Sequence, residues 1–194
     1  MRFLALFLVI GLSAEARADA TVGETAPSFS VQDVNGKTVS LADYKGKKVV
    51  LEWFNPDCPF VKYSHTDGPL KGQAAKAESD TVWIAINSGA PGKQGAGKDR
   101  NQKAVGEFGM EYPVLLDESG KVGRSYGAKT TPHMFVINEK GVLEYAGAID
   151  NAPFGKSKGA KMNYVDNALG SLAAGKAVDP RQTKPYGCSV KYGS

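Results

Sequence analysis

The sequence contains no block of five or six like charges. Its 24 Lys and Arg residues and 20 Asp and Glu residues leave a formal net charge of only +4, and the lysines are scattered along the chain. A basic patch or stripe is the usual electrostatic mark of proteins that bind nucleic acid. The charge pattern therefore predicts no nucleic-acid partner.

Apart from its first residues, the sequence has no apolar stretch of membrane length. Arg2 precedes an apolar run at 3–12, and Ala16-Arg17-Ala18 follows as an A-x-A site. This arrangement is typical of a secretory signal peptide and is too short for a comfortable membrane span. We expect residues 1–18 to be a signal peptide, with cleavage after Ala18 or Ala20. The mature protein is then periplasmic or secreted, with no stable membrane anchor.

Cysteine is scarce: Cys58 and Cys188 are the only two. Export places them in an oxidising compartment, where disulfides persist. An even count of two permits one disulfide, Cys58–Cys188. Three interpretations stay open on the residues alone. Cys58 is an active thiol, one half of a permanent crosslink, or an inert buried thiol.

Strand and helix patterns alternate through residues 19–176, which we predict to be one domain. An Asn35-Gly36 hairpin opens it, and the continuous apolar run at 47–54 is typical of a strand buried on both faces. An antiparallel hairpin and an amphipathic helix close it, and 177–194 form a polar tail carrying Cys188. The order predicts an α/β fold with three layers. Strands are predicted at 29–33, 47–54, 81–87, 112–117, 133–138 and 142–148, and helices at 57–67, 70–79, 100–109, 120–127 and 161–176.

The chemistry of Cys58 depends on its position directly after the buried strand. Pro59 suits the first turn of a helix, so the thiol is predicted beside the helix N-terminus, which favours the thiolate. Lys62 can add positive charge and Asp57 opposes it. Asn55 can donate a hydrogen bond to a sulfur or to a peroxide oxygen. These residues predict nucleophilic attack by the sulfur.

The remaining candidate residues have simpler interpretations. The Gly- and Lys-rich segment at 88–99 departs from a phosphate-binding loop because Asp99 stands where Ser or Thr is needed, so we predict a mobile loop. His65 is predicted on an exposed helix face. His133 lies either near the thiol or in the core. Trp53, Phe54, Phe60 and Tyr63 either line an apolar pocket or belong to the core.

Three segments together resemble the redoxin branch of the thioredoxin superfamily, the alkyl hydroperoxide reductase and thiol-specific antioxidant family. They are the G-x-x-A-P-x-F opening at 23–29, the turn "NPDCPF" at 55–60, and "TTPHMFVINEKGVLEYAG" at 130–147. The likeness runs from Val22 to Lys176. It implies a thioredoxin-like α/β/α sandwich with a central mixed sheet and an N-terminal β-extension. It also implies a cis bond before Pro132, facing the active cysteine and holding extended backbone against the site.

The sequence departs from this family in two ways. Asn55 replaces the first cysteine of a C-x-x-C turn, and no arginine precedes the strand after Pro132, although Arg124 or Lys62 could supply charge. The resemblance still implies a thiol oxidoreductase that uses Cys58, with Cys188 as resolving partner. Its substrates are then a peroxide or a protein or small-molecule disulfide, with a thiol reductant and no cofactor.

Two alternatives stay open beside this interpretation. One is a redox-inactive binding domain stapled by a structural Cys58–Cys188 disulfide. The other is a copper(I)-handling protein in which Cys58, His133 and Cys188 supply soft ligands.

Overall fold

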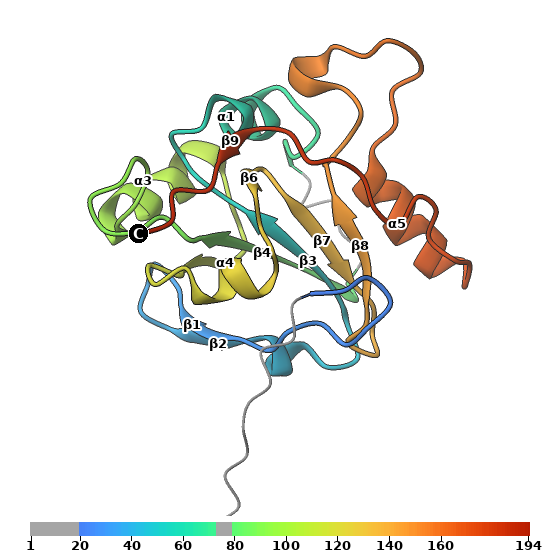
Figure 1. The fold of residues 1–194 in the computed structure, drawn as a ribbon, viewed down its shortest axis with the longest axis horizontal. Helices are drawn as coiled ribbons and strands as arrows, with labels where there is room; N and C mark the ends of the chain where they lie inside the picture. The colour runs from blue at the N-terminus through green and yellow to red at the C-terminus, as the bar shows by residue number, and fades with distance from the viewer. Residues whose placement is uncertain (1–19, 73–78) are drawn as a thin grey trace, which may run out of the picture.

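The computed structural model describes residues 20–72 and 79–194. At its centre lies a five-stranded sheet with the strand order β5-β4-β3-β7-β8 (Figure 1). β3, β4 and β5 run parallel, whereas β7 is antiparallel to β3 and β8 is antiparallel to β7. The strands are β3 (Lys48–Trp53), β4 (Thr81–Asn87), β5 (Val114–Leu116), β7 (Met134–Ile137) and β8 (Leu143–Gly147).

The composition of β3 explains its central place. All six of its residues are buried, and it pairs on both edges, so that Leu51 faces Ile84 of β4 and Phe135 of β7. A strand covered on both faces is built from continuous apolar residues rather than alternating ones. The turn that follows β3 therefore opens at the middle of the sheet's edge.

Helices cover both faces of the sheet. On one face lie α4 (Lys121–Ser125) and an N-terminal hairpin of β1 (Ser30–Gln32) and β2 (Thr38–Ser40), which is followed by the 3₁₀ turn η1 (Leu41–Tyr44). Leu51, Trp53 and Phe135 pack there against Tyr126 and Phe29. This hairpin is the predicted N-terminal β-extension.

The opposite face is covered by α1 (Pro59–Thr66), α3 (Lys98–Phe108) and α5 (Tyr164–Ala173). Val165 of α5 packs with Val50 and Val136 of the sheet. Val61 of α1 and Ala104 of α3 share a second cluster with the thiol of Cys58. The layers confirm the predicted three-layer α/β/α sandwich with a mixed sheet.

Several boundaries differ from the sequence predictions. The first helix begins at Pro59, with Cys58 as its N-cap, and α3 begins at Lys98. The helix predicted at 70–79 falls largely outside the described residues. Within the described ranges, no helix is long and apolar enough to span a membrane.

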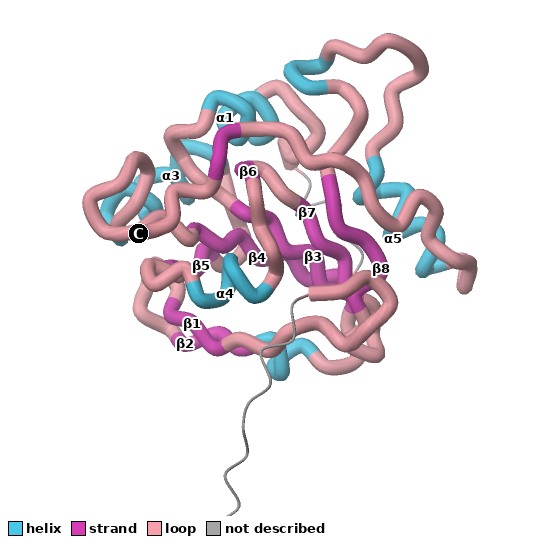
Figure 2. Tube along the Cα trace, viewed as in Figure 1, coloured by secondary structure: helices cyan, strands magenta, loops and turns pink. Residues whose placement is uncertain are grey.

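The C-terminal tail adds an element that the sequence did not predict. Its strand β9 (Cys188–Ser189) pairs antiparallel with β6 (Thr130–Thr131), the short strand before Pro132. Figure 2 shows the tail as a long loop that passes α1 and β6, interrupted by β9. A further 3₁₀ turn, η2 (Pro153–Gly155), lies in the loop before α5.

Candidate functional site

The Cys58 thiol lies at the junction between β3 and α1. Asn55, Pro56 and Asp57 turn the chain after the strand, and the Cys58 N–H donates to the Asn55 carbonyl at 3.1 Å. Pro59 occupies the first helical position, where its missing N–H costs no hydrogen bond. The Cys58 side chain is fully buried. The sequence therefore correctly placed a cysteine at the start of a helix after a central strand.

Two groups from distant parts of the chain contact the Cys58 sulfur. The Thr131 carbonyl oxygen lies 3.0 Å from it, and the Cys188 sulfur lies 2.9 Å from it. The Thr131–Pro132 bond is cis, as the family resemblance implied, and Thr131 faces Cys188 in the β6–β9 register. The structure thus brings together Cys58, Cys188 and the Pro132 turn.

The surroundings of Cys58 favour its thiolate. Burial raises the pKa of this thiol, but hydrogen bonds with the Cys188 side chain and with the Val61 and Cys188 backbone lower it, and the net pKa shift is downward. An N–H at the helix start stabilises negative charge. Thr131 is a site residue that sequence reasoning missed, although it stands in the quoted Thr-Thr-Pro segment.

Cys188 is perturbed in the opposite direction. Burial and the neighbouring Cys58 raise the pKa of the Cys188 thiol to about 11. Opposite shifts are expected when two thiols share one proton, with the Cys188 S–H donating to the Cys58 thiolate. Unlike Cys58, Cys188 is partly exposed. The pair therefore joins a buried Cys58, whose pKa is lowered, to a partly exposed Cys188, whose pKa is raised.

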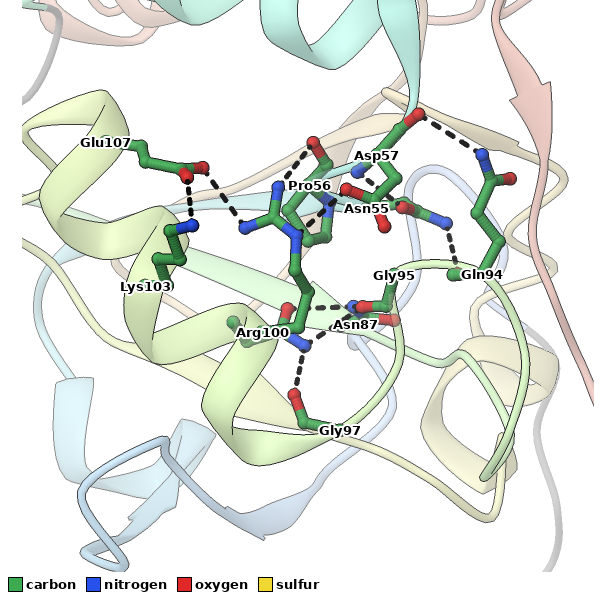
Figure 3. Close-up of polar contacts among 11 residues, drawn as sticks. Asn55, Pro56, Asp57, Asn87, Gln94, Gly95, Gly97, Arg100, Lys103 and Glu107 are labelled. Carbon is green, nitrogen blue, oxygen red and sulfur yellow. Dashed lines mark hydrogen bonds and ion pairs between the residues drawn. The ribbon is translucent and has the colours of Figure 1, made fainter.

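Asn55 does not serve the sulfur directly. Its amide nitrogen donates to the Gln94 carbonyl at 3.0 Å, and its amide oxygen accepts from the Asp57 N–H at 2.9 Å (Figure 3). The predicted hydrogen bond from Asn55 to a sulfur is not formed in this structure, where the amide nitrogen binds the loop after β4. Asn55 fixes the shape of the turn instead.

Arg100, at the start of α3, also binds this turn and was not predicted. Its Nε lies 2.9 Å from an Asp57 carboxylate oxygen, and its guanidinium also reaches the Pro56 carbonyl and Glu107 (Figure 3). Arg124, which the sequence suggested as a charge donor, instead donates to the Gly193 carbonyl. Nothing in the local pattern around Arg100 distinguished it from other surface arginines.

The predicted mobile loop at 88–99 is held by a buried amide network. The Gly95 carbonyl accepts from both Asn87 and Asn101, at 2.8 and 3.0 Å. Asn101 is fully buried and also donates to the Gly97 carbonyl at 2.7 Å. A Cβ on Gly95 would overlap the Asn55 side chain, so glycine lets the loop approach the turn. The loop is a support of the site.

The prediction that His65 lies on an exposed face is wrong. His65 is 5% exposed, and its Nε2 lies 3.0 Å from an oxygen of Glu52, which is fully buried on β3. A buried carboxylate requires such a partner. His65 also stacks on Phe108 of α3.

His133 belongs to the core rather than to the thiol pair. Its ring packs on Phe135, and its Nδ1 accepts from the Lys129 N–H at 3.3 Å. Burial, followed by the charge of Lys129, lowers the pKa of His133 to about 4. Among the described residues, no group of three His, Cys, Asp or Glu side chains could hold a metal ion. The copper(I) alternative thus lacks its third ligand in this part of the chain.

Aromatic side chains gather beside the two cysteines. Phe60 packs against Phe154 and Tyr186, with ring centroids 4.3 and 5.9 Å apart, and Tyr63 contacts the same Phe154. Phe154 is 42% exposed and has a φ of 52°. Trp53 and Phe54 belong to the core, whereas Phe60 and Tyr63 are half-buried.

The Redoxin family model matches residues 21–162 of the chain. The match includes the turn at 55–60 and the cis proline. It ends before the tail, so Cys188 lies outside it.

Three known proteins are similar over most of the domain. The thiol-disulfide oxidoreductase ResA of Geobacillus thermodenitrificans is 29% identical over 125 residues, which are 63% of this chain and 67% of that protein. A thioredoxin peroxidase of Echinococcus granulosus is 30% identical over 169 residues, 82% of this chain and 83% of that protein. The crystal structure of a hypothetical protein from Sinorhizobium meliloti has a TM-score of 0.77 and 26% identity, covering 91% of this chain and 97% of that one.

Proposed function

The chain belongs to the redoxin family, and from this premise we propose that it is a thiol–disulfide oxidoreductase whose redox centre is the pair Cys58 and Cys188. The observation that carries the proposal is the 2.9 Å separation of the two sulfurs together with their opposite pKa shifts. A structural crosslink does not need a low-pKa thiol, whereas thiol–disulfide exchange does.

Exposure and pKa together assign a direction to the exchange. In the oxidised form, an external thiolate attacks the Cys188 sulfur, because Cys188 is partly exposed and Cys58 is buried. The Cys58–Cys188 bond breaks, and Cys58 leaves as the thiolate, which is favourable because a low-pKa thiol is the better leaving group. A second external thiolate then attacks the partner's sulfur in the mixed disulfide. Cys188 leaves and takes a proton, so one disulfide and the reduced pair are formed.

The reverse sequence oxidises the pair. Cys188 attacks an external disulfide and releases one thiol, and the Cys58 thiolate then attacks the Cys188 sulfur and releases the second. Two electrons move in each direction, and a thiol or disulfide partner is the only co-reactant. Export, with removal of residues 1–18 and a periplasmic or secreted location, is part of the proposal. It rests on the N-terminal sequence and on the use of a disulfide, which persists in such compartments.

Peroxide reduction is a second candidate, favoured by the likeness to the thioredoxin peroxidase. In that reaction the Cys58 thiolate attacks a peroxide oxygen, an alcohol or water leaves, and Cys188 displaces water from the resulting sulfenic acid to give the disulfide. The peroxidase reaction also needs hydrogen-bond donors for the peroxide oxygens, and the two candidate donors already have other partners. Asn55 is bound to Gln94 and Arg100 is bound to Asp57. Thiol–disulfide exchange is therefore the better supported function.

Intact mass measurement tests the proposal. Reduced protein is mixed with one equivalent of oxidised glutathione at neutral pH. The wild type is expected to lose two hydrogens and to release both glutathione thiols. Cys58→Ser should stop at a glutathione adduct on Cys188, because the thiolate that completes the exchange is missing.

The outcome that contradicts the proposal is a wild-type protein that stays reduced or stops at an adduct. A parallel reaction with one equivalent of hydrogen peroxide ranks the two functions. Wild-type oxidation that is faster with peroxide than with the disulfide would favour the peroxidase.

A further inference from the structure

The C-terminal tail is docked along its length rather than free. Thr183 accepts from the Ala148 N–H at 2.9 Å, and the Tyr186 hydroxyl donates to Asp150 at 2.5 Å. Farther on, the Val190 N–H donates to the Lys129 carbonyl and the Ala90 N–H donates to the Lys191 carbonyl. Cys188 is therefore held against Cys58 by its neighbours on both sides. The polar tail predicted at 177–194 is thus docked on the domain in this structure.

The docked tail covers the edge of β6 beside the site. β9 pairs with β6, so the backbone edge of Thr130 and Thr131, next to Pro132, already has a strand on it. Gly187 lies so close that a Cβ there would overlap the Thr131 carbonyl oxygen, and its φ is +136°. The tail backbone thus rests directly on the turn that faces Cys58. Only glycine permits this approach.

An unfilled edge of this kind would accept another extended chain. Exposed strand edges carry unpaired N–H and C=O groups and bind peptides by adding a strand. Here a polypeptide disulfide would have to displace β9 before its backbone could pair with Thr131 beside the Cys58 sulfur. A single amino-acid disulfide needs no such pairing.

We propose that the tail occupies this polypeptide-binding edge. The docked protein therefore exchanges with low-molecular-weight disulfides and excludes polypeptide disulfides. The inference rests on the proposed function, because it takes Cys58 to be a reactive thiolate. Undocking residues 187–194 exposes both the Cys58 sulfur and the β6 edge. The substrate class then widens to extended polypeptides.

Matched probes test this proposal in a Cys188→Ser background, where Cys58 is the only thiol. One probe is N-acetylcysteine amide carrying thionitrobenzoate as a mixed disulfide. The second carries the same group on the single cysteine of a ten-residue unstructured peptide, and the third is that peptide with proline on both sides of the cysteine. In each case the Cys58 thiolate bonds to the cysteine sulfur, and the S–S bond breaks to release coloured thionitrobenzoate, the low-pKa leaving group. The readout is the ratio of the peptide rate to the single-residue rate.

Three tail variants are compared with this background. Gly187→Val forces the tail off Thr131 at full chain length, and a chain ending at Tyr186 removes it. Ser189→Val changes an exposed neighbour in the same strand and serves as the control. We expect a ratio near or below one in the background and the control. In both undocked proteins the ratio should rise about ten-fold or more, which equals about 1.4 kcal/mol of backbone pairing. The proline peptide should not share the rise, because it lacks an N–H next to the cysteine.

Each other outcome overturns the proposal. Equal acceleration of all probes would make the tail a simple cover of Cys58. A high ratio already in the docked protein would mean that the tail excludes nothing. If the shortened chain fails to fold, Gly187→Val decides. The glutathione experiment on wild-type protein does not depend on the tail leaving, so a failure here leaves that result standing.

Discussion

At the scale of single residues, the Cys188 thiol contributes to the lowered pKa of Cys58. The two sulfurs lie 2.9 Å apart, and an ionised Cys58 can only accept from the Cys188 S–H; this contact is the largest of the contributions that lower the Cys58 pKa. The same contact raises the pKa of Cys188 to about 11. The pKa of each thiol therefore depends on the protonation of the other.

Substituting Cys188 should therefore change the acidity of Cys58. Cys188→Ala removes the donor, so the Cys58 pKa should rise toward its ordinary value of 9.0. Cys188→Ser keeps an O–H donor and should raise the pKa less. The measurement is thiolate absorbance against pH, with the Cys58→Ser/Cys188→Ala double variant as the blank. Equal Cys58 pKa values in the alanine and serine variants would show that the hydrogen bond is not the cause.

Some of these residues could be predicted and others could not. Cys58 and Pro132 stand in local patterns, a strand end followed by proline and a Thr-Thr-Pro turn, whose meaning does not depend on distant contacts. The pairing with Cys188 depends on a tail 130 positions away (188 − 58), so the sequence only permitted it. His65 was mispredicted because its burial is decided by Glu52 on another element.

At the scale of elements, a loop and a helix start hold the active-site turn in place. The loop after β4 binds Asn55 through Gln94, and α3 binds Asp57 through Arg100 (Figure 3). Asn101 ties the two together, since it bonds the Gly95 and Gly97 carbonyls and Asn87. The amides of Asn55, Asn87 and Asn101 are buried, and lost hydrogen-bond partners are costly at buried polar groups.

Asn101→Ala should consequently destabilise the fold and loosen the turn. It removes the side-chain hydrogen bonds to the Gly95 and Gly97 carbonyls and from the Asn87 amide, at about 0.5–1.5 kcal/mol for each bond lost. Urea unfolding measures the loss, and the rate of disulfide formation with oxidised glutathione should fall as well. Lys103→Ala is the control on the same helix, because the Lys103 side chain is 73% exposed and should change stability by less than about 0.5 kcal/mol. Equal losses of stability in the two variants would show that the Asn101 network does not stabilise the fold.

Long elements with a clear apolar pattern could be predicted from the sequence almost to the residue. β4 was predicted as Thr81–Asn87 and is found there, since its buried run needs no outside information. β9 could not be predicted, because a two-residue strand has no pattern of its own and exists only through its pairing with β6. The glycines of the loop at 88–99 predict mobility. The loop is held by Asn55 and Asn101, which lie outside it in the sequence, so its own composition does not show what holds it.

At the scale of the whole molecule, the redoxin domain and its tail divide the chemistry between them. The family match at 21–162 contains Cys58 and the cis-proline turn, and the tail beyond it contains Cys188. The sandwich was predictable because strand order and a family resemblance agreed. The docking of the tail was not, because its contacts are spread singly over β8, β6 and the loop after β4.

The central claim is that Cys58 and Cys188 form a reversible redox pair in the folded protein. Redox titration of the native protein against thiol–disulfide buffers, followed by intact mass, tests it most directly. We predict one reversible two-electron transition with a potential above roughly −300 mV, the range of labile rather than structural disulfides. The exposed Cys188 sulfur and the stabilised Cys58 thiolate are the physical reasons. A disulfide that resists reduction in the folded protein and opens only after unfolding would contradict the account.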